Sequence, residues 1–223
     1  MRFVAFETST EWCSVAFWLD GEIAAIEERA GQGHSGRVLP MLDRLAAAAG
    51  IGLDALDAVA FGAGPGSFTG LRIACGVAQG IALARNIPVI GISTLEAMAE
   101  ESGAARVVAC LDARMREVYY AAHERIDGKS GGRWREAMAP QCVPPAAVVL
   151  PPGDGWIGCG NGFAAYGSLG LTRVMPQVHP SATAVARLAA PRLAEGGGVD
   201  AALAVPAYLR DKVAFTTAEL AAK

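Results

Sequence analysis

A glycine-rich stretch at residues 62–76, GAGPGSFTGLRIACG, is the part of the sequence most suggestive of chemistry. Glycines between an apolar run and a helical pattern are typical of loops whose backbone N–H groups bind phosphate. Both standard nucleotide signatures fail, because Leu71 and Arg72 replace the Lys-Ser/Thr of a P-loop and Thr69 replaces the third glycine of a dinucleotide loop. The residues of this candidate vestigial phosphate loop are Gly64, Gly66, Ser67 and Thr69. The alternative is a structural turn or docking loop.

Carboxylates and histidines are the other candidates for chemistry. Glu7 is either a metal- or phosphate-binding acid or a strand-end acid, and Asp112 can instead form an ion pair with Arg114 that locks a turn. No two of His34, His123 and His179 share metal-site spacing. His34 beside Ser35 lacks the geometry of a working nucleophile and base. The sequence therefore predicts no catalytic residue, no metal site and no cofactor.

Small residues recur along the helix that should follow the glycine-rich stretch. Two rows at four-residue spacing contain Ala74, Ala78 and Ala82, and Gly76, Gly80 and Ala84. Such rows let another helix approach closely. Glycine inside a helix costs about 1 kcal/mol relative to alanine, so two of them indicate a packing reason. The other helix belongs either to this chain or to a partner.

Composition narrows the class of protein. A net charge of −3 gives no global attraction to nucleic acid. The five cysteines are odd in number and form no CxxC pair, so we expect reduced thiols. Glu7 and Glu11 interrupt the first apolar run, and Arg72 and Arg85 interrupt the apolar window 70–92. We expect a soluble cytoplasmic protein with no secretion signal and no membrane contact.

The order of elements predicts an α/β fold. In the first hundred residues, strands are expected at 2–9, 13–21, 22–29, 56–61 and 88–92, and helices at 35–49, 67–84 and 93–101. Three tightly connected strands followed by two strand–helix units predict a mixed sheet with helices on its faces. In the second half, strands are expected at 106–112, 117–126 and 156–160, a glycine-rich turn at 127–134 and a helix at 181–195. A degraded repeat of the first half is one interpretation of this order, and the periodicity alone does not prove it.

Five segments in order resemble the TsaB family, also called YeaZ. They are FETST (6–10), HSGRVLPML (34–42), GPGSFTGLRI (64–73), LDARMREVYYA (111–121) and PAYLR (206–210). They span nearly the whole chain, and GPGSFTGLRI is the most specific of them. The family assists bacterial synthesis of threonylcarbamoyladenosine at position 37 of tRNA.

The resemblance implies an actin/sugar-kinase-like (ASKHA) fold with two RNase H-like lobes, each a mixed sheet flanked by helices. Residues 1–103 would form the N-terminal lobe with the partner-binding helices. Residues 104–223 would form the C-terminal lobe, a smaller or degraded version of the same fold. The family usually has Asp where this chain has Glu7, which puts an intact nucleotide site in doubt.

The implied function is that of a non-catalytic scaffold subunit. It would bind and activate TsaD, the catalytic paralogue, whose paired-histidine metal motif is reduced here to His34 alone. The ATPase TsaE would join the complex, and tRNA would be the substrate of the complex rather than of this chain alone. Without TsaD, a homodimer through the same helices is expected. The alternative is an enzyme of the same fold, an ATP-dependent phosphotransferase or a peptidase-like enzyme.

The resemblance also implies the interface, because family members pair with TsaD through the first two long helices of each protein. The residues expected at this partner or dimer interface are His34, Val38, Met41, Leu42, Leu45, Gly70, Ala74, Val77, Ala78, Gly80 and Ile81.

Overall fold

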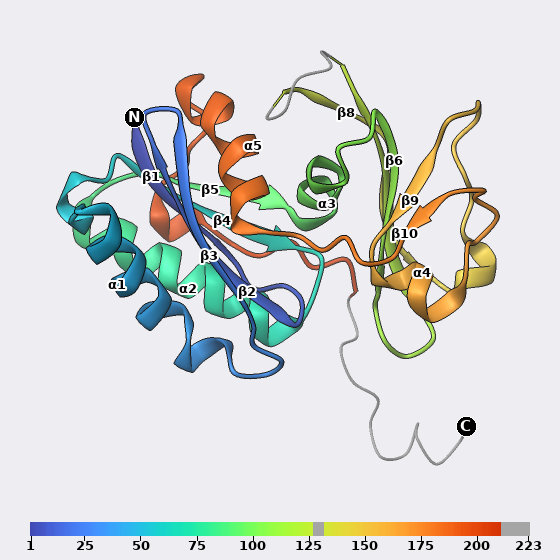
Figure 1. Cartoon of the computed structure of the whole chain (residues 1–223), viewed down its shortest axis with the longest axis horizontal. Helices are drawn as coiled ribbons and strands as arrows, with labels where there is room; N and C mark the ends of the chain where they lie inside the picture. The colour runs from blue at the N-terminus through green and yellow to red at the C-terminus, as the bar shows by residue number, and fades with distance from the viewer. Residues whose placement is uncertain (127–131, 211–223) are drawn as a thin grey trace.

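The computed structural model of the chain describes residues 1–126 and 132–210. Within these residues the strands form two five-stranded mixed sheets, one in each of two lobes (Figure 1). The glycine-rich turn expected at 127–134 lies largely outside the described residues.

The first sheet follows the order expected from the sequence. Its strands are β1 (Arg2–Glu7), β2 (Trp12–Leu19), β3 (Glu22–Arg29), β4 (Ala58–Gly64) and β5 (Val89–Ser93). Across the sheet they lie in the order β3-β2-β1-β4-β5, with antiparallel pairs among the first three strands and parallel pairs after them. Asp20 and Gly21 join β2 to β3 with φ of 54° and 111°, the positive values that a two-residue hairpin turn requires.

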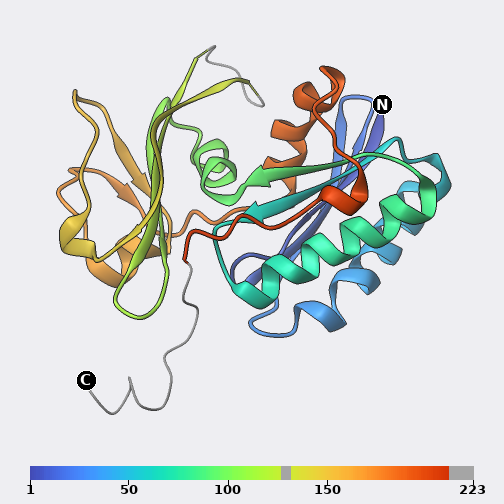
Figure 2. The same ribbon diagram turned by 180° about the vertical axis from the view of Figure 1, so that it is seen from behind.

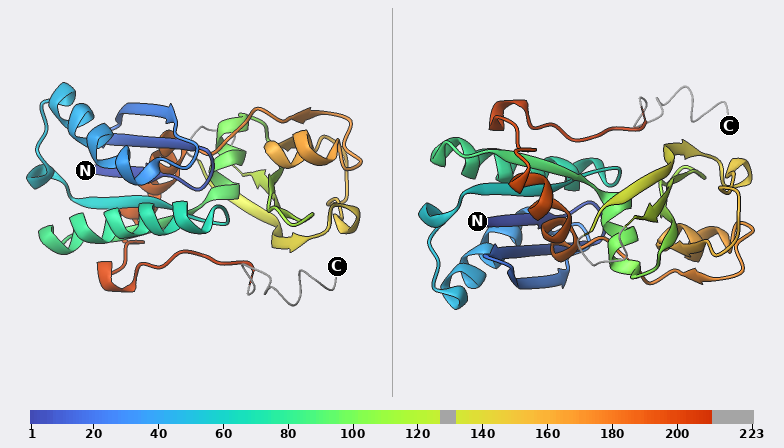
Figure 3. Two further views of the ribbon diagram at one scale, coloured as in Figure 1. Left: turned by 90° about the horizontal axis from the view of Figure 1, so that it is seen from below. Right: turned by 90° about the horizontal axis from the view of Figure 1, so that it is seen from above.

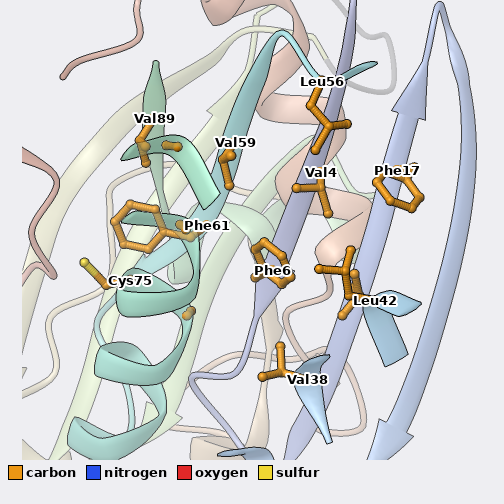
Figure 4. Close-up of a cluster of buried hydrophobic side chains, with 14 of the residues drawn as sticks. Val4, Phe6, Phe17, Val38, Leu42, Leu56, Val59, Phe61, Cys75 and Val89 are labelled. Carbon is orange, nitrogen blue, oxygen red and sulfur yellow. The ribbon is translucent and has the colours of Figure 1, made fainter. Parts of the chain in front are cut away.

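Helices cover both faces of this sheet. The helices α1 (Val38–Ala49) and α2 (Phe68–Arg85) lie on one face, and α5 (Ala182–Ala194) lies on the other (Figures 2 and 3). Successive side chains of β1 point to opposite faces of the sheet and pack against both helical layers. Val4 and Phe6 are buried beneath α1 and α2 (Figure 4), whereas Phe3 and Ala5 are buried beneath α5. Burial of a large apolar side chain contributes about 1.5–3 kcal/mol, so both helical layers are held by β1.

The second sheet repeats the topology of the first, with shorter strands only on its parallel side. Its elements are β6 (Arg106–Asp112), β7 (Val118–Arg125), β8 (Trp134–Val143), β9 (Ile157–Cys159), β10 (Val174–Met175) and the helix α4 (Asn161–Tyr166). The order is β10-β9-β6-β7-β8, again with an antiparallel meander and two parallel strands. The predicted class of two RNase H-like lobes is therefore confirmed. Short 3-10 helices occur at His34–Gly36, Leu53–Ala55, Pro145–Ala147 and Ala201–Leu203.

The two lobes exchange elements. The helix α3 (Thr94–Ser102) packs against β6 and β7 of the second sheet, while α5, from the second half of the sequence, packs on β1, β2 and β4 of the first. The division of the chain at residues 103 and 104 stays a prediction. This division assigns β6 to β10 to the second lobe, as the sheet does, but it also assigns α5 to the second lobe although α5 packs on the first sheet.

A buried histidine lies where β7, β8 and α5 approach one another. His123 is 4% exposed, and its ring meets the Trp134 ring edge-on with centroids 6.4 Å apart. Burial lowers the pKa of His123 to about 4, and the positive charge of Arg192 contributes to the decrease. The unfolded chain therefore takes up a proton near pH 6.5, whereas the folded chain does so only near pH 4.

This difference predicts a pH dependence of stability. The stability linked to His123 is complete above about pH 6.5 and is lost as the pH falls towards 4, in total on the order of 3 kcal/mol. Urea unfolding of the parent and of His123→Phe from pH 4 to 7 measures this. The variant should show a flatter dependence. Equal slopes for the two proteins would contradict the assignment.

Candidate functional site

The glycine-rich loop connects β4 to α2 at the end of β1. Ser67 caps α2, because its Oγ accepts a hydrogen bond from the Gly70 N–H at 3.3 Å. Two further bonds join the loop to β1: the Ser67 N–H donates to the Ser9 carbonyl at 2.7 Å, and Thr8 Oγ1 donates to the Gly70 carbonyl at 2.7 Å. Ser67 therefore serves as the helix cap, and Thr69, the other hydroxyl residue of the candidate phosphate loop, is exposed.

Close packing explains two of the glycines. A Cβ on Gly70 would lie 1.9 Å from the Thr8 carbonyl oxygen, and a Cβ on Gly66 would lie 2.6 Å from both Cβ and the carbonyl oxygen of Ser9. Only glycine fits such an approach. The backbone of residues 8 and 9 thus occupies the inner side of the loop, which supports the alternative of a structural turn.

Glu7 is buried beneath the same loop. It is 1% exposed, and its Oε1 accepts a hydrogen bond from the Ser9 N–H at 2.6 Å. A Cβ on Gly62 would lie 1.9 Å from Glu7 Oε2, so the two residues fit each other. Burial raises the pKa of Glu7. A carboxyl group enclosed in this way suits a structural role better than the binding of phosphate or metal in an open cleft.

A cleft of about 750 Å³ opens between the lobes beside the loop. Its lining includes Ser67 and Phe68 from the first lobe, Arg114 and Met115 from the second, and Arg210. Asp112 and Arg114 form the predicted ion pair at 3.1 Å, and the Arg114 N–H donates to Asp112 Oδ1 at 2.9 Å. Within residues 1–126 and 132–210, no three His, Cys, Asp or Glu side chains are grouped closely enough to hold a metal ion.

Most of the residues expected at the interface lie inside the lobe. Those buried in the first lobe are His34, Val38, Met41, Leu42, Leu45, Gly70, Ala74 and Ala78. The side chains of Val38, Met41, Leu42, Leu45, Ala74 and Ala78 form part of the core against the sheet (Figure 4). As buried residues, none of the set offers a surface to a partner in this structure. Val77 and Ile81 are half-buried, and Gly80 is exposed. Contact of the buried residues with a partner stays a prediction, because the periodicity that marks an apolar face does not say what covers it.

The opposite faces of the two helices form a separate surface, which we call the outer α1–α2 surface. Its residues are Leu39, Pro40, Asp43 and Ala47 of α1, and Thr69, Ile73, Gly76, Gly80 and Leu83 of α2. Leu39 is 49% exposed and Leu83 is 61% exposed. A Cβ on Gly76 or Gly80 would meet nothing within 4 Å, so no packing among residues 1–126 and 132–210 requires these glycines. The row of Gly76, Gly80 and Ala84 in the sequence was the signal for this surface.

The fold and the site place the chain among proteins of the actin/sugar-kinase-like class, and comparisons with known proteins give the family. A family model described as TsaD, tRNA N6-adenosine threonylcarbamoyltransferase, matches residues 26–218. The tRNA threonylcarbamoyladenosine biosynthesis protein TsaB of Escherichia coli K12 is 38% identical, over 96% of this chain and 97% of its own. The TsaB protein of Haemophilus influenzae is also 38% identical, over 96% of each chain.

A solved structure agrees with these relatives. YeaZ from Pseudomonas aeruginosa superposes with a TM-score of 0.87 at 39% identity, covering 93% of this chain and 99% of that one. The chain belongs to the TsaB (YeaZ) family of tRNA threonylcarbamoyladenosine biosynthesis proteins. Among the described residues, no helix has the length and apolar character needed to cross a membrane.

The close packing of the loop predicts opposite effects for two substitutions on one helix. Gly70→Ala should lower the free energy of unfolding by about 3 kcal/mol or more, since its methyl group meets the Thr8 carbonyl. Gly76→Ala is the matched control and should raise that free energy by about 1 kcal/mol. Urea unfolding measures both. A tolerated Gly70→Ala would show that the loop does not depend on this contact.

Proposed function

We propose that the chain is a non-catalytic scaffold subunit of the complex that makes threonylcarbamoyladenosine in tRNA. It binds TsaD and activates it, TsaE joins the complex, and tRNA is the substrate of the whole. The chain itself needs no cofactor, and the complex works in the cytoplasm. Membership of the TsaB family supports a part in this process, and the geometry of the outer α1–α2 surface supports the role of a docking subunit.

The observation that carries the proposal is the pair of exposed glycines inside α2. Each costs about 1 kcal/mol of helix stability relative to alanine, and nothing in the described part of the chain packs against either position. Both lie between apolar neighbours, Ile73 and Leu83, on the exposed side of the helix. A partner helix can approach the backbone closely at such positions, which gives the glycines a packing reason outside the chain.

The buried Glu7 and the packed glycine-rich loop argue against the alternative function, that of an ATP-dependent phosphotransferase. The loop N–H groups of Ser67 and Gly70 are already bonded to Ser9 and to the Ser67 side chain. A peptidase-like reaction has no feature in its favour among the described residues. The homodimer that forms without TsaD would use the same outer α1–α2 surface, because that surface is apolar and exposed.

Alanine at both glycines tests the interface. Gly76→Ala/Gly80→Ala should raise the free energy of unfolding by about 2 kcal/mol, because alanine favours the helix. The same methyl groups hold a partner helix away, so the affinity for TsaD should fall about tenfold, a loss of about 1.4 kcal/mol. Calorimetric titration with TsaD and thermal unfolding give the two values separately. A stability gain rules out misfolding as the cause of weaker binding.

Two further variants sharpen this test. Gly80→Leu should weaken the complex more than alanine does, because its side chain is larger. Ala194→Leu adds a similar side chain at the exposed end of α5, on the opposite face of the sheet, and should leave the affinity unchanged. Undiminished binding by both glycine variants would refute the docking surface, and no binding of TsaD by the parent chain would refute the scaffold.

A further inference from the structure

The last described segment of the chain, residues 199–210, crosses from the first lobe to the second (Figure 2). Val199 forms a bridge with Val89 at the edge of the first sheet, and the Gln79 side-chain amide donates to the Ala204 carbonyl at 2.9 Å. Farther along, the Ala207 N–H donates to the Ala63 carbonyl at 2.7 Å. These bonds fix the path of the segment, which we call the C-terminal strap. They bring Arg210 into the cleft lining and Tyr208 against Phe68 beside it.

An exposed aromatic pair stands where the C-terminal strap passes the start of α2. The rings of Phe68 and Tyr208 have centroids 5.6 Å apart and are 38% and 45% exposed as residues. The Arg72 guanidinium lies 3.8 Å from the centre of the Phe68 ring, and its Nε donates to the Tyr208 hydroxyl at 3.0 Å. Two exposed rings beside an arginine form the kind of platform on which unpaired nucleic-acid bases stack.

A strained hairpin faces this platform from the second lobe. Arg114, Met115 and Arg116 have φ of 60°, 56° and 60°, a left-handed conformation that costs each non-glycine residue about 1–2 kcal/mol. Arg210 holds the hairpin in place: it forms an ion pair with Glu117 and donates to the Ala113 carbonyl at 3.0 Å. Strain that the surroundings maintain is frequent at binding sites. The result is that Arg114, which lines the cleft, and the neighbouring Arg116 are both exposed.

The charges in and beside the cleft divide into two sets. Arg29, Arg114 and Arg210 form ion pairs with Glu11, Asp112 and Glu117. Arg72 and Arg116 differ, since neither forms a salt bridge within the described part of the chain. An arginine without a carboxylate partner is suited to binding phosphate, because the phosphate oxygens accept hydrogen bonds from the guanidinium N–H groups. The positive charge is therefore local, on a chain whose net charge is −3.

We propose that the surface beside the interlobe cleft, where Phe68 lines the cleft and Arg72 and Tyr208 pack against Phe68, binds a single-stranded RNA segment. One unpaired base stacks on Phe68 and Tyr208, and the neighbouring phosphates contact Arg72 and Arg116. Unpaired loops are the parts of an RNA whose bases are free to stack in this way. The inference rests on the proposed function, because a complex that modifies tRNA brings such a loop to its subunits. A free nucleotide offers the same base and phosphate, and the experiment separates the two.

The test uses the full chain and a fluorescein-labelled single-stranded RNA followed by anisotropy at low salt. Arg72→Gln/Arg116→Gln should weaken binding about tenfold, and Phe68→Ala/Tyr208→Ala by a similar factor. Arg173→Gln is the matched control: Arg173 is exposed, directly precedes β10 at the edge of the second sheet and forms no salt bridge within residues 1–126 and 132–210. It should bind as the parent does. The same RNA annealed into a duplex should bind more weakly, and excess ATP should not displace the single strand.

Each outcome decides the proposal without involving TsaD. Equal RNA affinity for the parent and both double variants overturns it, as does no binding by the parent. Displacement by ATP would assign the site to a free nucleotide instead. If a double variant fails to unfold cooperatively, Arg116→Gln alone serves, because that side chain is exposed. In the reconstituted complex with TsaD, Arg116→Gln should raise the KM for tRNA and leave the affinity for TsaD unchanged, because Arg116 belongs to the second lobe and not to the outer α1–α2 surface.

Discussion

The contact between Gly70 and the backbone of Thr8 is the constraint on which the described site depends. It holds the first turn of α2 against the end of β1 at a distance that only glycine permits. The contact also sets the rotation of α2 about its axis. Ala74 and Ala78 consequently face the sheet, while Gly76 and Gly80 face away from it. A side chain at residue 70 would therefore disturb both the loop and the surface that α2 presents.

The same packing explains why the glycine-rich loop is poorly suited to binding phosphate. A phosphate site needs free N–H groups and open space, whereas this loop bonds to residues 8 and 9 and covers the enclosed carboxyl group of Glu7. Glu7 fits in this position because Gly62 has no side chain and leaves room for Glu7 Oε2. The loop thus positions α2 within the first lobe, and the chemistry suggested by its glycines gives way to a structural role.

Much of the fold was predictable from the sequence, because it depends on local signals. The Asp20-Gly21 turn, the Ser67 cap and the Asp112–Arg114 turn all depend on neighbours in the chain. The orientation of the helices was harder to predict. Both rows of α2 consist of small residues, so hydrophobic periodicity does not distinguish the row that meets the sheet from the row that stays exposed.

Long-range features account for what the sequence did not reveal. The return of α5 to the first sheet and the path of the C-terminal strap depend on contacts between residues more than a hundred positions apart, such as Gln79 with Ala204. The strands β8 and β10 were not predicted, because one is largely exposed at a sheet edge and the other has two residues. The paired lobes nevertheless follow from one repeated strand order.

The central claim is that the chain supports a reaction carried out by another protein. The most direct measurement is a reconstituted assay of threonylcarbamoyladenosine formation in tRNA, in which this chain and TsaD are each omitted in turn. We predict no product when either is absent and full activity when both are present with TsaE and the activated precursor. Activity without this chain, or activity of this chain in the absence of TsaD, would contradict the account.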